Sequence, residues 1–284
     1  MKVVVLLICE EDVYQGGLKT LNSISYFHPE FEIVKYGKKE ISRLQKELNC
    51  QNMLFLTPIA MKEVWHDKKP DLLIKIGGDL LVLGKLNEVL NSEYCVAAGR
   101  NDPDLVTWDE SHNRPYGIKD VPNNEWVNAD FICVKNEKFI EDYYNVTMEY
   151  ATGKRFCVPG HLGDDQHSLN LVFRIYGYKS LILDKRDSGV IYNASGNWSG
   201  EDQRKEGIPE VLRKAGLGAN TWTSWKYINF NGSECVLPDN GIGCGERVVK
   251  VLHQGGGTWE PKLSWELFNP TFREYLFKVT GFDK

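Results

Sequence analysis

The 284-residue sequence lacks the features of several protein classes. Its 34 Lys and Arg residues are outnumbered by 39 Asp and Glu residues, so general binding to nucleic acid or to an anionic membrane is not expected. No apolar run is long enough to span a bilayer, and the short apolar start meets three acids without a cleavage-type sequence. The seven cysteines contain no Cys-x-x-Cys pair, which is typical of unpaired thiols in a reducing compartment. We therefore expect a cytoplasmic protein with no membrane span and no nucleic-acid partner.

A dinucleotide-binding motif is also missing. The first apolar run, residues 3–8, is followed by acids and not by Gly-x-Gly-x-x-Gly, which argues against a nicotinamide-dependent oxidoreductase. An acidic strand end is a poor phosphate cradle. Glu11, Asp12 and Tyr14 are better suited to the base and ribose of a nucleotide, through hydrogen bonds and an apolar ring wall. A charged loop with a packing tyrosine is the alternative.

The apolar pattern predicts an α/β fold with a mostly parallel central sheet flanked by helices. Unbroken apolar runs are typical of strands buried on both faces, whereas apolar residues three or four positions apart indicate helices. Strands are expected at residues 2–9, 31–36, 72–76, 95–98 and 126–134. Helices are expected at residues 18–25, 38–48, 59–65, 137–150 and 263–282, with a long surface loop over residues 100–124.

The segment Gly77-Gly78-Asp79 ends the apolar run of residues 72–76. The two glycines allow a sharp turn and the close approach of a ligand. A carboxylate at this point lies on the carboxyl edge of a parallel sheet, where open α/β sheets bind ligands and where it suits a hard cation. The alternative is a turn that carries a solvated acid.

Gly163 and Asp164 form a natural cap for a helix whose buried side carries Leu169 and Phe173. Asp164, Asp165 and Gln166 then occupy the first turn, where the helix dipole favours negative charge. Capping explains one acid better than it explains two acids and a glutamine.

An aromatic segment lies between residues 193 and 244. Aromatic faces with interleaved polar groups suit stacking on a sugar acceptor, and a small satellite core is the alternative. The residues are Trp198, Trp222, Trp225, Tyr227 and Phe230.

Taken in order, these motifs resemble a GT-A glycosyltransferase and are most similar to glycosyltransferase family eight, the glycogenin-like family. The matching segments are Glu11-Asp12-Val13-Tyr14, the helix that leads to His28-Pro29, the strand that ends at Asp79, the strand start with Asn128, the Asp165-Gln166 helix start and His253 in a Gly-rich segment. Residues 197–244 lie outside the resemblance.

The resemblance implies one GT-A domain over residues 1–284. Residues 1–100 would be the nucleotide-binding half, residues 101–192 the acceptor and catalytic half, and residues 193–284 a C-terminal elaboration on the acceptor side. The implied reaction is metal-assisted transfer of a sugar from a nucleotide-sugar donor, a UDP-hexose, to a hydroxyl of a glycan or glycoconjugate acceptor, with retention of anomeric configuration.

The resemblance also assigns site residues. Asp79 and His253 would bind Mn²⁺ or Mg²⁺, and a mixed carboxylate and imidazole pair suits Mn²⁺ better. Asp165 and Gln166, with Asp164 beside them, would face the anomeric carbon. The residues implied to contact the donor are Glu11, Asp12, Tyr14, Gly78, Asn128 and Lys262.

Two departures from the family pattern stand out. Gly77 replaces the first acid of the Asp-x-Asp motif, and Trp259-Glu-Pro-Lys262 replaces Lys-Pro-Trp, so Lys262 is a shifted candidate for the phosphate contact. A non-catalytic carbohydrate- or nucleotide-sugar-binding protein derived from such an enzyme is therefore the alternative to a transferase.

Overall fold

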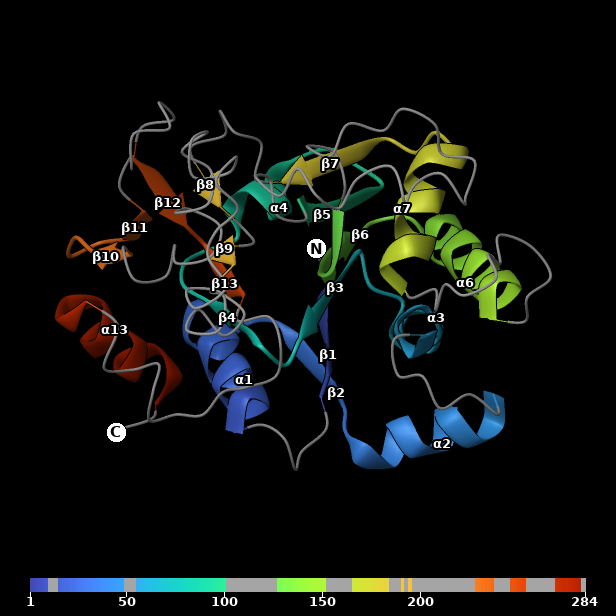
Figure 1. The fold of residues 1–284 in the computed structure, drawn as a ribbon, viewed down its shortest axis with the longest axis horizontal. Helices are drawn as coiled ribbons and strands as arrows, with labels where there is room; N and C mark the ends of the chain where they lie inside the picture. Colours follow the sequence, from blue (N-terminus) through green and yellow to red (C-terminus); the bar gives the residue numbers. More distant parts are fainter. Residues whose placement is uncertain are drawn as a thin grey trace, which may run out of the picture.

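In the computed structural model, the described residues are 1–9, 15–48, 55–100, 127–151, 165–183, 190–191, 194–195, 228–237, 246–253 and 269–281. They form a six-stranded sheet with helices on both faces and two smaller sheets beside it (Figure 1). The spatial order of the large sheet is β2 (Glu32–Tyr36), β1 (Val3–Ile8), β3 (Leu72–Gly77), β6 (Val127–Val134), β5 (Val96–Arg100) and β7 (Ser180–Leu183).

The sheet is mixed but mostly parallel, and the expected α/β class is confirmed. β1 runs parallel to β2 and β3, and β5 runs parallel to β7. β6 is antiparallel to both of its neighbours, β3 and β5. All five strands expected from the apolar runs are present. The loop expected over residues 100–124 lies outside the described residues apart from Arg100, which ends β5.

Both faces of the sheet are buried, which explains the unbroken apolar runs. In β1, Val4 and Leu6 pack into one hydrophobic cluster, while Val5 and Leu7 pack into another on the opposite face. The first cluster is covered by α2 (Lys38–Leu48), α3 (Leu56–Lys68), α6 (Glu137–Ala151) and α7 (Asp165–Ile175). The second is covered by α1 (Gln15–Phe27) and α4 (Asn87–Asn91).

α3 is longer than the predicted helix over residues 59–65. It begins at Leu56 because Pro58 lies in the first turn, where its missing N–H costs no helical hydrogen bond. It ends at Lys68, and Lys69 follows with a positive φ of 47°. The predicted helix over residues 263–282 is described only from 270 to 280 as α13 (Pro270–Thr280), which Asn269 caps through the Thr271 N–H.

A three-stranded sheet joins the two ends of the chain. Its order is β4 (Leu80–Val82), β13 (Val251–His253) and β9 (Ala194–Ser195). Leu80 and Val82 pack towards α1, while Leu81 packs into a third hydrophobic cluster that includes Phe272 of α13. The remaining sheet has the order β10 (Asn229–Phe230), β11 (Cys235–Leu237), β12 (Arg247–Val249) and β8 (Val190–Ile191).

Within the described ranges, the helices are too short or too polar to cross a membrane. Cys9, Cys95, Cys133 and Cys235 form no disulfide bonds.

Candidate functional site

The pairing of β4 with β13 brings Asp79 and His253 together. β3 ends at Gly77, and Asp79 lies in the short turn that leads into β4. In the antiparallel register of β4 and β13, His253 pairs with Leu80, the residue after Asp79. His253 Nε2 consequently lies 3.4 Å from Asp79 Oδ2. The two residues that the sequence singled out as a metal pair are therefore neighbours, although they come from opposite ends of the chain.

A second carboxylate completes this group. Asp130 lies in β6, and its Oδ2 is 3.2 Å from His253 Nε2. Asp79, Asp130 and His253 each offer one ligand atom, and these atoms all lie within 4.8 Å of one another. The sequence reasoning missed Asp130. The available signal was an acid inside a largely apolar strand, between Ala129 and Phe131.

The protonation states of these three residues depend on one another. Burial alone would lower the pKa of His253, but the carboxylates of Asp79 and Asp130 outweigh it and raise the pKa to about 10. Burial likewise opposes ionisation of Asp130, yet Lys75 and His253 hold the pKa of its carboxyl well below the usual range. In the protein without an ion, an imidazolium therefore lies between two carboxylates.

The residues of this group fit a divalent cation. A cation binds the neutral imidazole and takes the place of the proton that the two carboxylates stabilise. One imidazole and two carboxylates form a donor set that Mn²⁺ accepts, whereas Mg²⁺ prefers oxygen ligands alone. Asp79 has 22% of its side chain exposed, which leaves an accessible side on the group for a ligand.

The two glycines before Asp79 serve packing. A Cβ on Gly78 would lie 2.7 Å from Cys9 Sγ, so Gly78 makes room for the end of β1. Thr20 Oγ1 fixes the same turn by donating to the Gly78 and Leu80 carbonyls at 3.0 and 2.6 Å. Neither Gly77 nor Gly78 has a positive φ, so the expected sharp turn does not depend on a left-handed glycine.

Asp165 and Gln166 begin α7, as expected for the first turn of a helix. Asp165 is buried, and its carbonyl accepts a hydrogen bond from the Tyr143 hydroxyl at 2.9 Å. Asn170 joins this turn to β6, because its Nδ2 donates to the carbonyls of Gln166 and Val127 while its Oδ1 accepts from the Val127 N–H. The start of β6 and the first turn of α7 are thus held together.

The side chain of Asn128 binds the backbone of its own strand. Its Oδ1 accepts the Asp130 N–H at 2.6 Å, so this oxygen helps to orient Asp130. The remaining predicted site residues lie outside the described residues: Glu11, Asp12, Tyr14, Asp164 and Lys262. Of the predicted aromatic group, Trp198, Trp222, Trp225 and Tyr227 also lie outside. Phe230 stacks on Tyr275 with ring centroids 4.1 Å apart, which favours the satellite-core interpretation for this residue.

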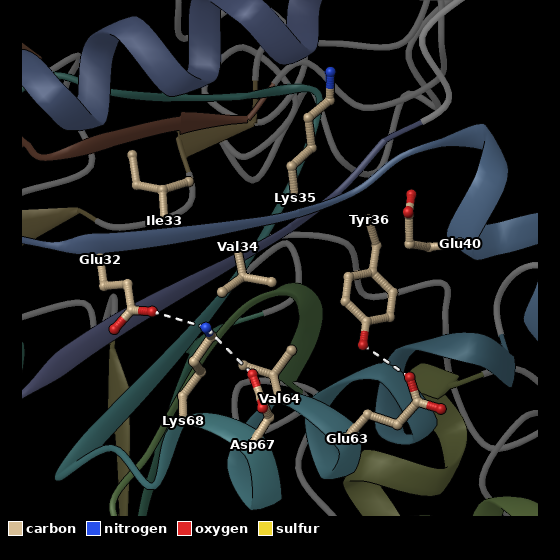
Figure 2. Close-up of a pocket in the computed structure, with 10 residues that line it drawn as sticks. All are labelled: Glu32, Ile33, Val34, Lys35, Tyr36, Glu40, Glu63, Val64, Asp67 and Lys68. Carbon is tan, nitrogen blue, oxygen red and sulfur yellow. Dashed lines mark hydrogen bonds and ion pairs between the residues drawn. The ribbon is translucent and has the colours of Figure 1, made fainter.

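A groove of about 540 Å³ runs between the edge strand β2 and α3 (Figure 2). Several of its polar side chains are paired with one another. Lys68 Nζ lies 3.1 Å from Glu32 and 3.2 Å from Asp67, and the Tyr36 hydroxyl donates to Glu63 at 2.8 Å. None of the predicted site residues lines this groove, so we do not assign it to a donor or acceptor.

No protein-family model and no curated protein sequence matches the chain. Its fold, however, is similar to those of solved glycosyltransferases. An active-site variant of LgtC superposes with a TM-score of 0.53 at 13% identity, over 98% of this chain and 95% of that chain. Mouse xyloside xylosyltransferase 1 in its apo form gives 0.52 at 10% identity, over 90% of this chain and 98% of that chain.

The apo glycosyltransferase GlyE of Streptococcus pneumoniae TIGR4 gives a TM-score of 0.53 at 13% identity. The match covers 100% of this chain but 61% of GlyE, so the chain spans about three fifths of that protein. The structural neighbours include family-eight and other GT-A glycosyltransferases. Identities this low show the fold alone, and the chain has the GT-A glycosyltransferase fold.

Proposed function

We propose that the chain is a metal-assisted glycosyltransferase that transfers a sugar from a nucleotide-sugar donor, a UDP-hexose, to a hydroxyl of a glycan or glycoconjugate. One observation carries the proposal. In a GT-A fold, the carboxylate that follows β3 lies 3.4 Å from an imidazole on β13, beside a second carboxylate. Such a group at the end of a buried strand suits the diphosphate of a donor with its divalent cation.

Asp79 and His253 would hold that cation, with Mn²⁺ preferred over Mg²⁺. When bound, it stabilises the negative charge that develops on the departing nucleoside diphosphate. In the transfer, the bond between the anomeric carbon and the diphosphate oxygen breaks. A bond forms between that carbon and the acceptor oxygen, whose proton passes to the departing diphosphate. The electron pair of the broken bond leaves with the nucleoside diphosphate.

The first turn of α7 would face the reacting carbon. In this proposal Asp165 and Gln166, with Asp164 beside them, contact the sugar and lead to retention of configuration. Asn170 supports this placement, since it joins the turn to the strand that carries Asp130. Should Asp165 instead reach the acceptor hydroxyl, it would act as a general base and the configuration would invert.

Donor contacts are proposed for Glu11, Asp12 and Tyr14 with the nucleoside, and for Gly78, Asn128 and Lys262 with the ribose and diphosphate. Of these, Gly78 lies in the turn after β3, and Asn128 lies in β6, two residues before Asp130.

The proposal is tested by measuring turnover of UDP-glucose, UDP-galactose, UDP-xylose and GDP sugars after EDTA treatment and after addition of Mn²⁺. We expect Mn²⁺-dependent release of nucleoside diphosphate from one donor. Asp79→Ala should abolish this release, because it removes a cation ligand, while circular dichroism stays unchanged. Near-normal turnover in that variant would contradict the metal assignment.

A non-catalytic nucleotide-sugar-binding protein is a second candidate, which the glycine at position 77 favours. It would bind one donor without turnover in either condition. If the protein leaves the whole panel both unbound and unchanged, the glycosyltransferase proposal is wrong.

A further inference from the structure

Asp130 lies opposite the glycine that breaks the Asp-x-Asp pattern. The antiparallel register of β3 and β6 pairs Ile74 with Cys133 and Ile76 with Phe131. One further step along both strands sets Gly77 against Asp130. Residues directly opposite one another in an antiparallel pair project to the same face of the sheet, with Cβ atoms about 5 Å apart. A side chain at position 77 and the side chain of Asp130 would therefore lie side by side on the same face of the sheet.

The space above Gly77 contains carboxylate oxygens. A Cβ added to Gly77 would lie 2.8 Å from Asp79 Oδ1 and 3.4 Å from Asp130 Oδ1. The absence of a side chain at this position lets Asp130 reach towards Asp79 and His253. An acid at position 77 would compete for that same space.

The Asp130 carboxylate is held in place from behind. Lys75 Nζ lies 3.5 Å from Asp130 Oδ1 and donates to the Ala129 carbonyl at 2.7 Å. Lys75 is buried, with 5% of its side chain exposed. Oδ2 points the other way and lies 3.2 Å from His253 Nε2. One oxygen is thus anchored to the sheet while the other faces the imidazole.

We infer that the carboxylate absent from position 77 is supplied across the strand pair by Asp130, which ligates the divalent cation together with Asp79 and His253. The inference rests on the proposed function, in which this cation binds the donor diphosphate. It makes Gly77 a compensated change, so the chain keeps two acids and one imidazole at the site.

The experiment measures Mn²⁺ binding directly, from the loss of the free Mn²⁺ signal in electron paramagnetic resonance, using the whole chain with and without UDP. Asp130→Asn should weaken binding by at least about tenfold, as should Asp79→Asn, because a lost direct ligand costs no less than a lost outer-shell partner. Glu137→Gln is the control. It alters a separate, more exposed group of His66, Glu137 and Glu141 that could also bind metal, and it should leave the site at Asp79, Asp130 and His253 unchanged.

An exchange variant tests the position itself. Gly77→Asp combined with Asp130→Ala returns the acid to β3 and removes it from β6, and it should recover Mn²⁺ affinity to within a few fold of the wild type. Gly77→Ala combined with Asp130→Ala adds the same Cβ without a carboxylate and should stay weak. The atoms near a new Cβ are Asp79 Oδ1 and Leu80 Cδ1, at the ends of flexible side chains. A small shift of these ends makes room for the Cβ, while Asp79 Oδ2, the oxygen nearest His253, stays available to the cation. Near-ultraviolet circular dichroism checks that each variant is folded.

The outcomes separate this inference from the proposed function. If the wild type binds Mn²⁺ and consumes a donor while Asp130→Asn binds Mn²⁺ equally well, the role of Asp130 is wrong and the glycosyltransferase proposal stands. If Asp130→Asn loses Mn²⁺ but the wild type consumes no donor, the cation site stands and the transferase proposal fails. If the exchange variant is folded but does not recover Mn²⁺ affinity, the inference that Asp130 replaces an acid at position 77 is wrong.

Discussion

At the scale of single residues, His28 shows how a buried polar side chain is kept neutral. Its Nε2 accepts the Leu86 N–H at 3.1 Å, so the ring proton lies on Nδ1, which faces Glu30 Oε1 at 3.2 Å. The ring also stacks on Phe31 with centroids 4.3 Å apart. His28 therefore joins the end of α1 to the start of α4 in its uncharged form.

This arrangement predicts a loss of stability in mild acid. Burial lowers the pKa of His28, although Glu30 partly opposes the shift. The unfolded chain then binds a proton at His28 as the pH falls below about 6.5, before the folded protein does, so the free energy of unfolding decreases. We expect the wild type to lose more stability than His28→Gln between pH 7.5 and pH 5.5 in urea titrations. An equal pH dependence of the two proteins would contradict this role.

The candidate site was partly readable at this scale. Asp79 was found because a carboxylate that follows a buried strand suits a cation, whereas His253 was assigned only through the resemblance to family eight. Asp130 was missed because its importance comes from its position opposite Gly77, and a cross-strand register is a tertiary property that no local pattern contains.

At the scale of elements, α1 packs closely against the end of β1 and the turn after β3. Cys9 Sγ lies between two glycines, where an added Cβ would approach it to 2.5 Å at Gly17 and 2.7 Å at Gly78. Cys9 is buried, so this sulfur has little space in which to move. The contact sets how closely α1 approaches the strand ends that carry the site.

The contact predicts that the effect of Gly17→Ala on the free energy of unfolding depends on whether residue 9 is Cys or Ala. In the wild type, Gly17→Ala should lower the free energy of unfolding by about 1–3 kcal/mol, because overpacking outweighs the gain in helix propensity. In a Cys9→Ala background the sulfur is gone, and the nearest atom to the new Cβ at position 17 is the Cβ of residue 9, at 3.3 Å. Gly17→Ala should then become neutral or stabilising by about 0.5 kcal/mol. A double-mutant cycle in urea measures the coupling, and equal effects in both backgrounds would contradict it.

Most elements were predictable because their buried apolar residues recur at a regular spacing. α2 has the predicted bounds, since Ile41 and Leu44 mark its buried side within a charged sequence. The antiparallel direction of β6 was not predictable, because an apolar run is the same in either direction. The length of α3 was underestimated because no side chain caps its start at Phe55, so the sequence carries no local signal for the first residues of this helix.

At the scale of the whole molecule, the C-terminal segments are built into the structure formed by the first hundred residues. β13 pairs with β4, and α13 covers the third hydrophobic cluster (Figure 1). The Tyr275 hydroxyl donates to the Leu83 carbonyl at 2.7 Å, and Asn22 Nδ2 donates to the Thr280 carbonyl at 2.6 Å. Sequence periodicity predicted the helix that contains α13 but not β13, and it does not contain the pairing of β13 with β4, which depends on contacts between distant parts of the chain.

These contacts predict that a destabilising substitution in α13 lowers the stability of the whole fold. Phe272 has no exposed surface, and Phe272→Ala should lower the free energy of unfolding by about 3–5 kcal/mol. Calorimetry should show one transition at a lower temperature, because α13 and the first hundred residues share a core. Glu274→Ala, at an exposed position of the same helix, is the control. A separate early transition with an unchanged main peak would show that α13 unfolds independently.

The pairing of β13 with β4 has a consequence for protein synthesis. A chain emerging from the ribosome can begin to build β1, β2 and β3 early, since N-terminal regions are the first to become available for folding. His253 cannot meet Asp79 until translation has passed position 253, long after β1, β2 and β3 are available. A stalled or prematurely terminated product would thus carry the turn at Asp79 without its imidazole partner.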